Sequence, residues 1–499
     1  MRNIRVYILF ILFNISVSAF AQTEIYISPT GQDSNDGLSA QTPIKSFSKV
    51  LEKITPGSTV YVMPGQYTSG LALKPEHSGT KDKYIIFKAY NSEDKPLFYY
   101  GGNNKWNCID IQASYVIIDG LELEGYNQSF DQTSAKSDSL AAYSYSQRYH
   151  EQGGAGFDWS GCAKYNTNAI SIGKGGKDGG FPHHVTIQNC KVHDFPGGGI
   201  GSQQSDWITI ENNEVYNCAW YCMYACSGIS ILNPYNCDNI DNEYKIRVVG
   251  NTVYNNHTKI PWCTSSNFRL SDGNGIIIDV NVSPDNTTIQ EIKTGGAYRG
   301  KTLVANNVSY HNGGSGIHAF KAANVDIINN TSYYNEQRYD GEYGEIFSQL
   351  GRNNRIVNNI MFARTNHSCN NYVGDGGGTY DHNLYFGGKY LLSATDSYGD
   401  PAFVIVPRHI GDNTDFHLLA MSKAIGAGIS TEYMPLSDKD GIVRGAKIDV
   451  GAYCANSTDA LIKVCKDIDS DTYYNLLGKR ITSFFSVFFI VNGKKVYVE

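Results

Sequence analysis

A short pattern of alternating apolar and polar residues recurs along the chain. Its copies read apolar-x-apolar-x-Asn and then continue through Val or Ser and Tyr towards a further Asn. They include VTIQNCKVHD, ITIENNEVYN, IRVVGNTVYNN, TLVANNVSYHN, VDIINNTSYYN and NRIVNNIMFA. Alternation over a few residues, interrupted by Gly and Asn, predicts short β-strands separated by turns rather than helices.

The copies of this pattern align on one column of asparagines. The column contains Asn213, Asn251, Asn307, Asn330 and Asn359. Cys190 occupies the same column. The spacing from Cys190 to Asn213 equals the spacing from Asn307 to Asn330. A repeat of roughly 22–30 residues is typical of one coil of a solenoid, in which stacked coils bury a continuous core. We therefore predict an all-β chain that forms a right-handed parallel β-helix, with the asparagines hydrogen-bonded in a ladder from coil to coil.

The ends of the chain differ from the repetitive region. Residues 1–21 contain two Arg, an apolar run and a small-x-small site, which predicts a secretory signal peptide and therefore a secreted protein. Residues 22–455 are predicted to form the β-helix, with an amphipathic helix at Ser46–Ile54 as an N-terminal cap over the first coil. Residues 456–499 are predicted to form a short tail. This tail resembles a C-terminal module that is common in exported proteins of the Bacteroidetes.

Composition narrows the possible partners. The net charge is -7 and no basic run occurs, which argues against binding to nucleic acid. Beyond the signal peptide, no segment is long and apolar enough to cross a bilayer. The chain has 36 Tyr, a residue whose flat face and hydroxyl suit sugar surfaces as well as packing. We expect a monomer that binds a polysaccharide.

Two further features remain open at this stage. The chain has 11 Cys, and the group Cys218, Cys222, Cys226 and Cys237 fits a metal site, disulfides or buried thiols. Two polar stretches, 127–159 and 281–299, interrupt the repeats and are predicted to be loops that shape a binding face.

Six segments with a common start define the first strand of successive coils. They align on Ile170, Ile200, Ile229, Ile276, Ile317 and Ile346, which we predict to point inward. Period-two alternation then places Asp279, His318 and Glu345 on the outer face of three neighbouring strands. Each step between them is a diagonal of roughly 8 Å between Cα atoms. Two carboxylates and an imidazole on one patch are suited to acid–base chemistry.

Other candidate site residues surround this predicted patch. Asp272 is a possible turn former and, together with Asp279, a possible calcium ligand. The remaining candidates are a Lys leaving the His318 strand, an amide and an Arg near the Asp279 strand, and aromatic residues for stacking on sugars. They are Lys321, Asn274, Arg269, Trp220, Tyr221 and Trp262. The pair His183–His184 at the start of another strand is predicted to be structural.

The segment from Asp272 to Val280, together with the following GSGIHAFKAANVDIINNTSYYN, resembles the central coils of family nine polysaccharide lyases. These are secreted pectate-lyase-like β-helices, and the resemblance implies a pectin-lyase-like solenoid. In that family a Lys on the Gly-Asn-Gly strand is the base, and an Asp cluster one or two coils earlier holds calcium. Here Ile277 occupies the Lys position, and the earlier strands GGGIGSQQ and CSGISILN carry no Asp cluster, so neither feature transfers.

Three functions follow from these residues. A polysaccharide lyase acting on a pectin-like uronate polymer could use His318 or Lys321 as base, with Asn274, Arg269 or a bound calcium ion neutralising the substrate carboxylate. A glycoside hydrolase would use two of the carboxylates Asp272, Asp279 and Glu345, with His318 as an orienting partner. A surface protein that binds glycans without catalysis is the third alternative. We predict the lyase, with the hydrolase as the main alternative.

Overall fold

The computed structural model describes residues 23–101, 105–152, 159–173, 180–281, 298–338, 343–371, 378–390 and 393–455, together with the backbone of 473–474, 487–491 and 494–498. The predicted signal peptide, most of the polar stretch 281–299 and most of the tail lie outside these residues. The described backbone near the C-terminus forms a three-stranded antiparallel sheet of β33 (Tyr473–Tyr474), β34 (Val487–Val491) and β35 (Lys494–Val498).

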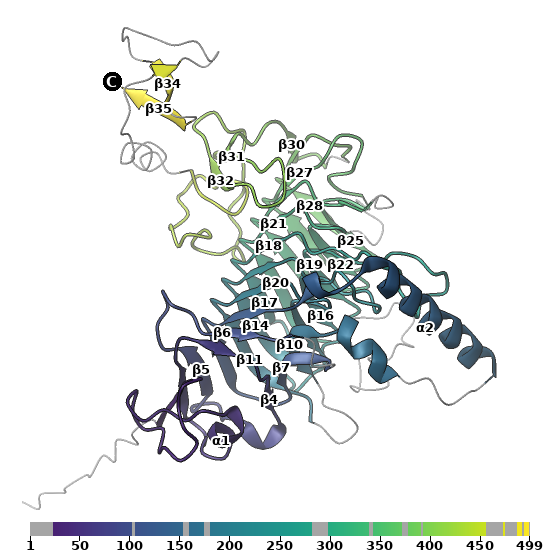
Figure 1. Cartoon of the computed structure of the whole chain (residues 1–499). Coiled ribbons are helices and arrows are strands. Elements are labelled where there is room, and N and C mark those ends of the chain that lie inside the picture. Colours follow the sequence, from purple (N-terminus) through teal and green to yellow (C-terminus); the bar gives the residue numbers. More distant parts are fainter. Residues whose placement is uncertain are drawn as a thin grey trace, which may run out of the picture.

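Three parallel β-sheets run along the solenoid. Neighbouring strands within a sheet come from successive coils (Figure 1). The first sheet contains β1 (Glu24–Ile27), β2 (Thr59–Val62), β5 (Ile85–Ala89), β8 (Val116–Asp119), β11 (His183–Gln188), β14 (Asp206–Glu211), β17 (Tyr244–Val249), β20 (Lys301–Ala305), β23 (Val325–Ile328), β26 (Arg355–Val357) and β28 (Thr379–Asp381). The second sheet contains β4 (Leu71–Leu73), β7 (Asn107–Ile111), β10 (Asn168–Gly173), β13 (Ile200–Gln203), β16 (Ile229–Leu232), β19 (Ile276–Asp279), β22 (Ile317–Phe320) and β25 (Ile346–Gln349). The third sheet contains β3 (Gln66–Tyr67), β6 (Leu97–Tyr99), β9 (Glu122–Glu124), β12 (Lys191–His193), β15 (Glu214–Tyr216), β18 (Thr252–Tyr254), β21 (Val308–Tyr310), β24 (Thr331–Tyr333), β27 (Ile360–Phe362), β29 (Leu384–Phe386) and β30 (Ser397–Tyr398). The predicted right-handed parallel β-helix is confirmed.

A short helix closes the N-terminal end of the solenoid, as predicted. Helix α1 (Phe47–Leu51) begins after Ser46, whose hydroxyl accepts the N–H of Lys49. Its buried residues, Phe47 and Val50, pack on the core that the first coils share. The helix therefore covers apolar surface that would otherwise be exposed at the end of the solenoid.

The prediction of a loop at 127–159 was wrong in its main part. This segment contains the 3₁₀ turn η2 (Asn127–Ser129) and the long helix α2 (Gln132–Gln152), which projects to the side of the solenoid (Figure 1). Asp131 starts the helix, because its carboxylate accepts the N–H of Ser134 at 2.7 Å. Among the described residues, no helix is both long and apolar enough to cross a membrane.

The remaining elements are short. They are the 3₁₀ helices η1 (Pro75–His77) and η3 (Trp159–Tyr165), and the antiparallel pair β31 (Phe403–Ile405) and β32 (Asp415–Leu418).

The predicted asparagine ladder is present and longer than the repeats indicate. Each asparagine side-chain oxygen accepts two bonds from the residue one coil before it, one from the backbone N–H and one from the side-chain amide. For Asn251 and Asn307 these bonds measure 2.9 and 3.0 Å. The ladder starts at the N–H of Cys190 and continues past Asn359 to Asn383 and then Asp396. All of the asparagines in it are buried, so each bond saturates a backbone group that water cannot reach.

The residue before each ladder position explains the repeated Asn-Asn pair. Asn306, Asn329 and Asn358 all have a left-handed backbone, with φ of 55°, 53° and 57°. Asparagine tolerates this conformation better than most residues, and Gly250 takes the same role before Asn251 with φ of 71°. The first residue of each pair therefore turns the chain, and the second joins the ladder.

A second ladder that the repeats did not reveal runs parallel to the first. It leads from Cys218 through Asn256 and Asn312 to Asn335, with the same double hydrogen bonds between successive asparagines. It ends on the carboxylate of Glu345. This ladder flanks the strands of the second sheet, on which the candidate site lies.

The structure shows a disulfide and free thiols among the four cysteines whose roles the sequence left open. Cys222 and Cys226 form a disulfide, while Cys218 is a buried thiol. Cys237 is a half-buried thiol. Part of the tyrosine excess is also structural, because Tyr216, Tyr254 and Tyr310 stack face to face from coil to coil.

Candidate functional site

The strand alignment made from the sequence is confirmed in register. Ile276 pairs with Ile229 on one side and with Ile317 on the other, and Ile317 pairs with Ile346. The alignment also extends back through Ile200 to Ile170. All six side chains are buried in the core, so the alternate positions of these strands face outward.

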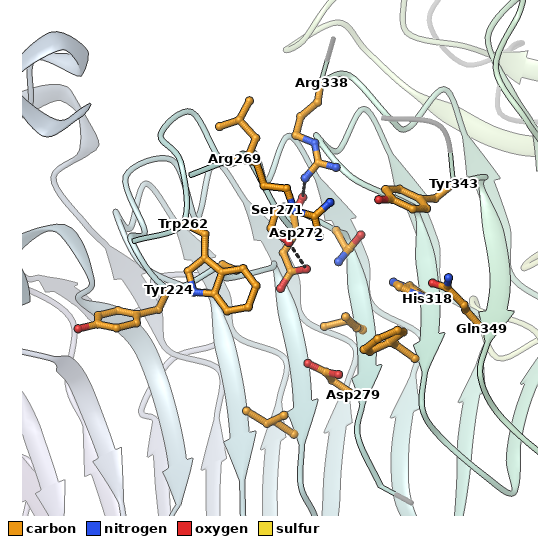
Figure 2. Close-up of a pocket in the computed structure, with 16 residues that line it drawn as sticks. Tyr224, Trp262, Arg269, Ser271, Asp272, Asp279, His318, Arg338, Tyr343 and Gln349 are labelled. Carbon is orange, nitrogen blue, oxygen red and sulfur yellow. Dashed lines mark hydrogen bonds between the residues drawn. The ribbon is translucent and has the colours of Figure 1, made fainter. Parts of the chain in front are cut away.

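A pocket of about 460 Å³ lies on this outer face of the second sheet (Figure 2). Its floor comes from alternate positions of four adjacent strands, β16, β19, β22 and β25. These floor residues are Leu232, Ile277, Asp279, His318, Phe320 and Gln349. Its walls come from the segments that precede the strands, in particular residues 269–272 before β19 and Arg338 and Tyr343 before β25. The pocket is therefore a rigid floor with walls of connecting segments, which suits a binding site.

Two carboxyl groups lie in this pocket and act on each other. Asp279 ends β19, and its Oδ1 is buried without a hydrogen-bond partner among the described residues. Burial raises the pKa of Asp279 to about 6, an effect that the charge of Lys321 reduces. Burial and then the charge of Asp279 raise the pKa of Asp272 to about 7, against the opposing effects of Arg338, Ser271 and Arg269. Near neutral pH this pair can therefore hold one proton on Asp272 while Asp279 is ionised.

The conformation of Asp272 results from the turn that enters β19. Asp272 and Gly273 both have a left-handed backbone, with φ of 55° and 70°. Arg338 donates a hydrogen bond of 2.7 Å to the backbone oxygen of Asp272, which fixes the turn from above. The sequence predicted either a turn residue or a site residue here, and the structure gives Asp272 both positions: it forms the turn and lines the pocket.

His318 lies on the strand next to Asp279, opposite Ile277. Its ring stacks on Phe347 with a centroid distance of 4.1 Å, and its Nε2 is buried without a hydrogen-bond partner among the described residues. Burial lowers the pKa of His318 to about 3, so the imidazole is neutral at working pH. As predicted, Asp279 and His318 are diagonal neighbours, since Asp279 pairs with Phe320.

Cationic and aromatic side chains surround the two carboxyls. Arg269 and Arg338 lie above Asp272 in Figure 2. Trp262 and Tyr224 lie on one side of the carboxyls, and Tyr343 lies on the other side, near His318 and Gln349. Guanidinium groups bind carboxylates, and aromatic faces stack on sugar rings.

The orientation predicted for Glu345 was wrong. Its side chain is 1% exposed and does not line the pocket. Ser332 Oγ and the backbone and side-chain nitrogens of Asn335 donate to its carboxylate at 2.6–2.8 Å. Glu345 stands one residue before the strand, where alternation no longer applies. The four preceding coils have glycine there, and a Cβ on Gly316 would lie 2.0 Å from Ser332 Oγ. That position points into the second ladder, so Glu345 ends the ladder, and burial raises its pKa to about 8.

Four other predicted residues have positions that bear on their roles. Trp220 and Tyr221 do not line the pocket; they pack in the cluster beneath α2, and Lys259 lies 3.0 Å from the Trp220 ring centroid. Lys321 does not line the pocket either, although its charge acts on Asp279. Asn274 lines the pocket, but its side chain already bonds Ser227 Oγ and the N–H of Ser315. It is therefore a structural bridge between coils.

Arg338, Tyr343 and Gln349 line the pocket but were not among the residues predicted from the sequence. Arg338 and Tyr343 belong to the segment before β25, as Asp272 belongs to the segment before β19. That equivalent position is a signal in the sequence, although it does not specify the path of the segment or the direction of its side chains. Gln349 pairs with Phe320 in register and follows from the alternation that selected Asp279.

The pocket residues do not form a calcium site by themselves. Calcium takes six to eight oxygen ligands, whereas the pocket supplies two carboxyls with raised pKa and two neighbouring guanidinium groups that repel a dication. Among the described residues, groups of three or more close His, Cys, Asp or Glu ligands occur elsewhere and include no pocket residue. No step below is routed through calcium.

The fold and the pocket define a right-handed parallel β-helix with an acidic and cationic pocket on one sheet. Residues 25–174 match the family described as "Pel9A-like, right handed beta helix region". Pectate lyase PEL9 of Emericella nidulans is 29% identical over 113 residues, which cover 23% of this chain and 22% of the relative. The chain thus spans less than a quarter of that relative, and the family match ends before the first pocket residue, Tyr224.

Solved structures with a similar fold include pectate lyase Pel9A, at 16% identity and a TM-score of 0.44, covering 87% of this chain and 96% of that protein. A rhamnogalacturonan lyase is 15% identical with a TM-score of 0.36, covering 72% of this chain and 87% of that protein. These likenesses concern the fold alone.

Proposed function

We propose that the protein is a carbohydrate-active enzyme that cleaves a uronate-containing, pectin-like polysaccharide by β-elimination in the pocket of the second sheet. The observation that carries this proposal is the pair Asp272 and Asp279. Two carboxyls with pKa values of about 7 and about 6 share one pocket, next to Arg269 and Arg338. A protonated acid, an ionised base and a cationic partner are what elimination from a uronate requires.

Arg269 and Arg338 would engage the carboxylate of the uronate. Pairing that carboxylate with guanidinium groups withdraws charge and makes the adjacent C5 proton more acidic. In this proposal the arginines replace the metal ion as the neutralising group. In family nine polysaccharide lyases a lysine is the base. Here Ile277 occupies that position and forms part of the apolar floor, so another residue must act as the base.

Asp279 would then remove the C5 proton. Its Oδ1 has no competing hydrogen bond among the described residues, and its pKa of about 6 is close to the pH at which a base works best. As electrons shift to form the C4–C5 double bond, the bond from C4 to the glycosidic oxygen breaks. Asp272, protonated at this stage, gives its proton to that leaving oxygen. One proton is taken up and one is given, so the step balances.

His318 would serve as a neutral polar group next to the reacting sugar. The sequence suggested His318 as the base, but a pKa of about 3 makes it a much weaker base than Asp279. Lys321, the other candidate base, does not line the pocket. The role of Asp279 is therefore supported by both position and basicity.

Hydrolysis is the second candidate, and the same pair of carboxyls favours it. Asp272 would again protonate the leaving oxygen, while Asp279 would activate a water molecule or attack the sugar itself. The arginines support elimination, because they would neutralise the substrate carboxylate, which elimination requires and hydrolysis does not.

A single assay separates these outcomes. The protein is incubated with a panel of uronate polymers and matched neutral polymers, and both new reducing ends and the ultraviolet absorbance of the unsaturated product are followed. Elimination gives both signals on uronates only. Reducing ends without the absorbance indicate hydrolysis. Binding without either signal would overturn the enzyme proposal and favour a glycan-binding protein.

A further inference from the structure

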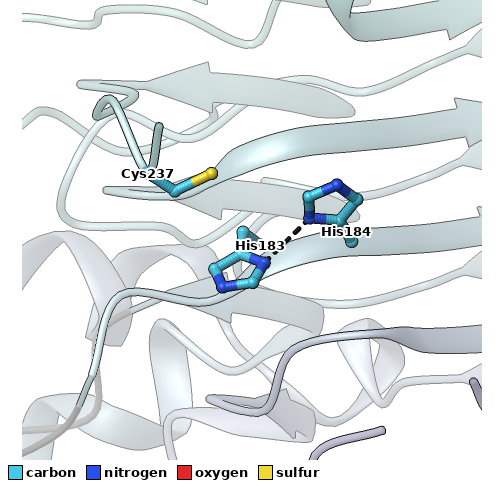
Figure 3. A group of neighbouring side chains, drawn as sticks. All are labelled: His183, His184 and Cys237. Carbon is cyan, nitrogen blue, oxygen red and sulfur yellow. Dashed lines mark hydrogen bonds between the residues drawn. The ribbon is translucent and has the colours of Figure 1, made fainter. Parts of the chain in front are cut away.

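A cluster of potential metal ligands lies at the N-terminal end of β11, a middle strand of the first sheet, and includes no residue that lines the pocket. His183 and His184 begin β11, and Cys237 lies in the segment between β16 and β17 (Figure 3). The Nδ1 atoms of the two imidazoles are 2.8 Å apart. One ligand atom from each of the three residues lies within 4.8 Å of the other two.

The backbone explains why two consecutive histidines face the same space. Neighbouring side chains of a strand normally point to opposite faces, but His184 has a left-handed backbone with φ of 55°. Its ring is held between Tyr115 and Trp207, at centroid distances of 4.7 and 5.2 Å and nearly parallel to both. The convergence of the two rings is therefore fixed by packing.

The two imidazoles have few other polar contacts. Among the described residues, the ring nitrogens of His183 and His184 have only each other as hydrogen-bond partners. That contact requires one Nδ1 to carry a proton and the other to accept it. A neutral imidazole is the form that binds a metal ion, through whichever ring nitrogen is free of a proton.

Two nearby carboxylates are already engaged and supply charge rather than ligands. Asp206 and Asp238 both accept from the fully buried ammonium of Lys245, at 3.2 and 2.5 Å. Tyr298 also donates to Asp206, and Trp207 donates to Asp238. With two carboxylates and one ammonium, the cluster has one excess negative charge beside the imidazoles, which favours a cation there.

The donor set identifies the class of ion. Two imidazoles and a thiolate suit zinc and its neighbours, such as cobalt, nickel and copper, whereas calcium and magnesium require oxygen ligands. In a tetrahedral zinc site two imidazole nitrogens lie roughly 3.3 Å apart, which is about half an ångström more than the present contact. A small rotation of the His183 ring would increase the distance between the two nitrogens by this amount.

We propose that His183, His184 and Cys237 bind one zinc-class divalent ion, with solvent as the fourth ligand. On binding, the Cys237 thiol loses its proton to solvent and a metal–sulfur bond forms, so each ion bound releases one proton from the site. The ion would join the start of β11 to the segment before β17, two coils further on. Such a link would stabilise the solenoid and does not depend on the reaction proposed for the pocket.

Cobalt(II) is the probe for the test, because cobalt bound to thiolate has an intense near-ultraviolet absorption and a coordination-sensitive visible spectrum. The chelator-treated full-length protein is titrated with Co²⁺ and then with Zn²⁺, and its melting temperature is followed in both. We expect one equivalent of Co²⁺ to bind and the thiolate absorption to appear. Added Zn²⁺ should displace the cobalt and abolish that absorption, and either metal should raise the melting temperature.

Variants assign the ligands. Cys237→Ser should remove the thiolate absorption, and His183→Gln should weaken binding by about tenfold or more, since even residues that only support ligands cost that much. The matched controls are Cys454→Ser and His417→Gln, a thiol and an imidazole outside the cluster, which should leave the titration unchanged. Circular dichroism identifies any variant that fails to fold. Absence of the thiolate absorption in the folded wild type, or equal binding by the folded His183→Gln variant, overturns the proposal.

Discussion

Glu345 accepts both the backbone N–H and the side-chain amide of Asn335, at 2.8 and 2.6 Å. Asn335 accepts the same two bonds from Asn312, at 3.0 and 2.8 Å. A carboxylate therefore occupies the place that an asparagine would take if the ladder continued. The first ladder ends in the same way, with Asp396 accepting both groups of Asn383. A ladder whose members each donate to the next coil needs a final acceptor, and the two oxygens of a carboxyl group supply it.

Removing this acceptor should lower stability without affecting chemistry. Glu345→Ala leaves the buried N–H of Asn335 without its acceptor and removes one bond each from the Asn335 amide and the Ser332 hydroxyl, which should reduce the free energy of unfolding by about 1–3 kcal/mol. Glu345→Gln retains one oxygen and should lose less. Chemical denaturation measures the loss, with the exposed Glu93→Ala as the control. If folded Glu345→Ala were inactive on a substrate of the wild type, the residue would regain the catalytic role that the sequence suggested.

Glu345 was predicted to face outward but is buried at the end of the second ladder. This difference shows how far a repeat pattern can predict a solenoid. The inward isoleucines and the asparagine column follow from repetition, because identical positions in successive coils must have identical surroundings. Asp279 and His318 follow from the same alternation, which is exact within a strand. Glu345 lies one residue outside the strand, where turn geometry decides the direction of the side chain.

The non-repetitive parts could not be predicted in the same way. Arg338 and Tyr343 reach the pocket from a connecting segment whose path no periodic pattern specifies. Helix α2 lacks a clear apolar stripe, so its Ser- and Gln-rich sequence was taken for a loop, although Asp131 is a good N-cap. His183 and His184 converge only because the backbone of His184 is left-handed. Strict alternation along a strand would place the two side chains on opposite faces.

Asp279→Asn should stabilise the folded protein in a way that depends on pH. The folded-state pKa of about 6 lies above the ordinary value of 3.8, so the stability that this carboxyl contributes is full below pH 3.8 and is lost as the pH rises through 6. The neutral amide avoids that loss. We expect a gain of about 1–3 kcal/mol at pH 8 and almost none at pH 4. Thermal melts of both proteins at the two pH values test this, and an equal effect at both would contradict a buried ionised Asp279.

The pH dependence of cleavage should reflect both carboxyls. Asp279 must be ionised, so kcat/KM should fall as the pH drops below about 6. Asp272 must be protonated, so kcat/KM should also fall as the pH rises above about 7. Because the two groups interact, the limbs report the apparent pKa values of the pair. Initial rates from pH 4 to pH 9 would show a narrow bell, and a rate that kept rising to pH 9 would exclude Asp272 as the acid.

Calcium should have no effect on the proposed cleavage. Arg269 and Arg338 already provide positive charge where a metal ion would neutralise the substrate, and the two carboxyls supply too few oxygens for a resident ion. Cleavage rates of chelator-treated protein should therefore be the same with and without added calcium. The matched comparison is Arg269→Ala, which should be impaired; partial rescue of its rate by calcium would show that the ion can replace the guanidinium. A wild-type rate that depends strongly on calcium would contradict the arginine role.

Trp262 and Trp220 should differ in their effects on substrate binding, although both were expected to stack on sugars. Trp262 lines the pocket, whereas Trp220 lies against Lys259 in the cluster beneath α2 and donates to the backbone oxygen of Asn255. Removing a stacking face costs roughly 1.4 kcal/mol, so Trp262→Ala should raise KM about tenfold with little change in kcat, and Trp262→Phe should retain most of the affinity. Trp220→Ala should lower the melting temperature and leave KM of the folded protein unchanged. Steady-state kinetics below both melting points provides the comparison. A larger KM effect at Trp220 would place the sugar path beneath α2 instead of along the floor of the second sheet.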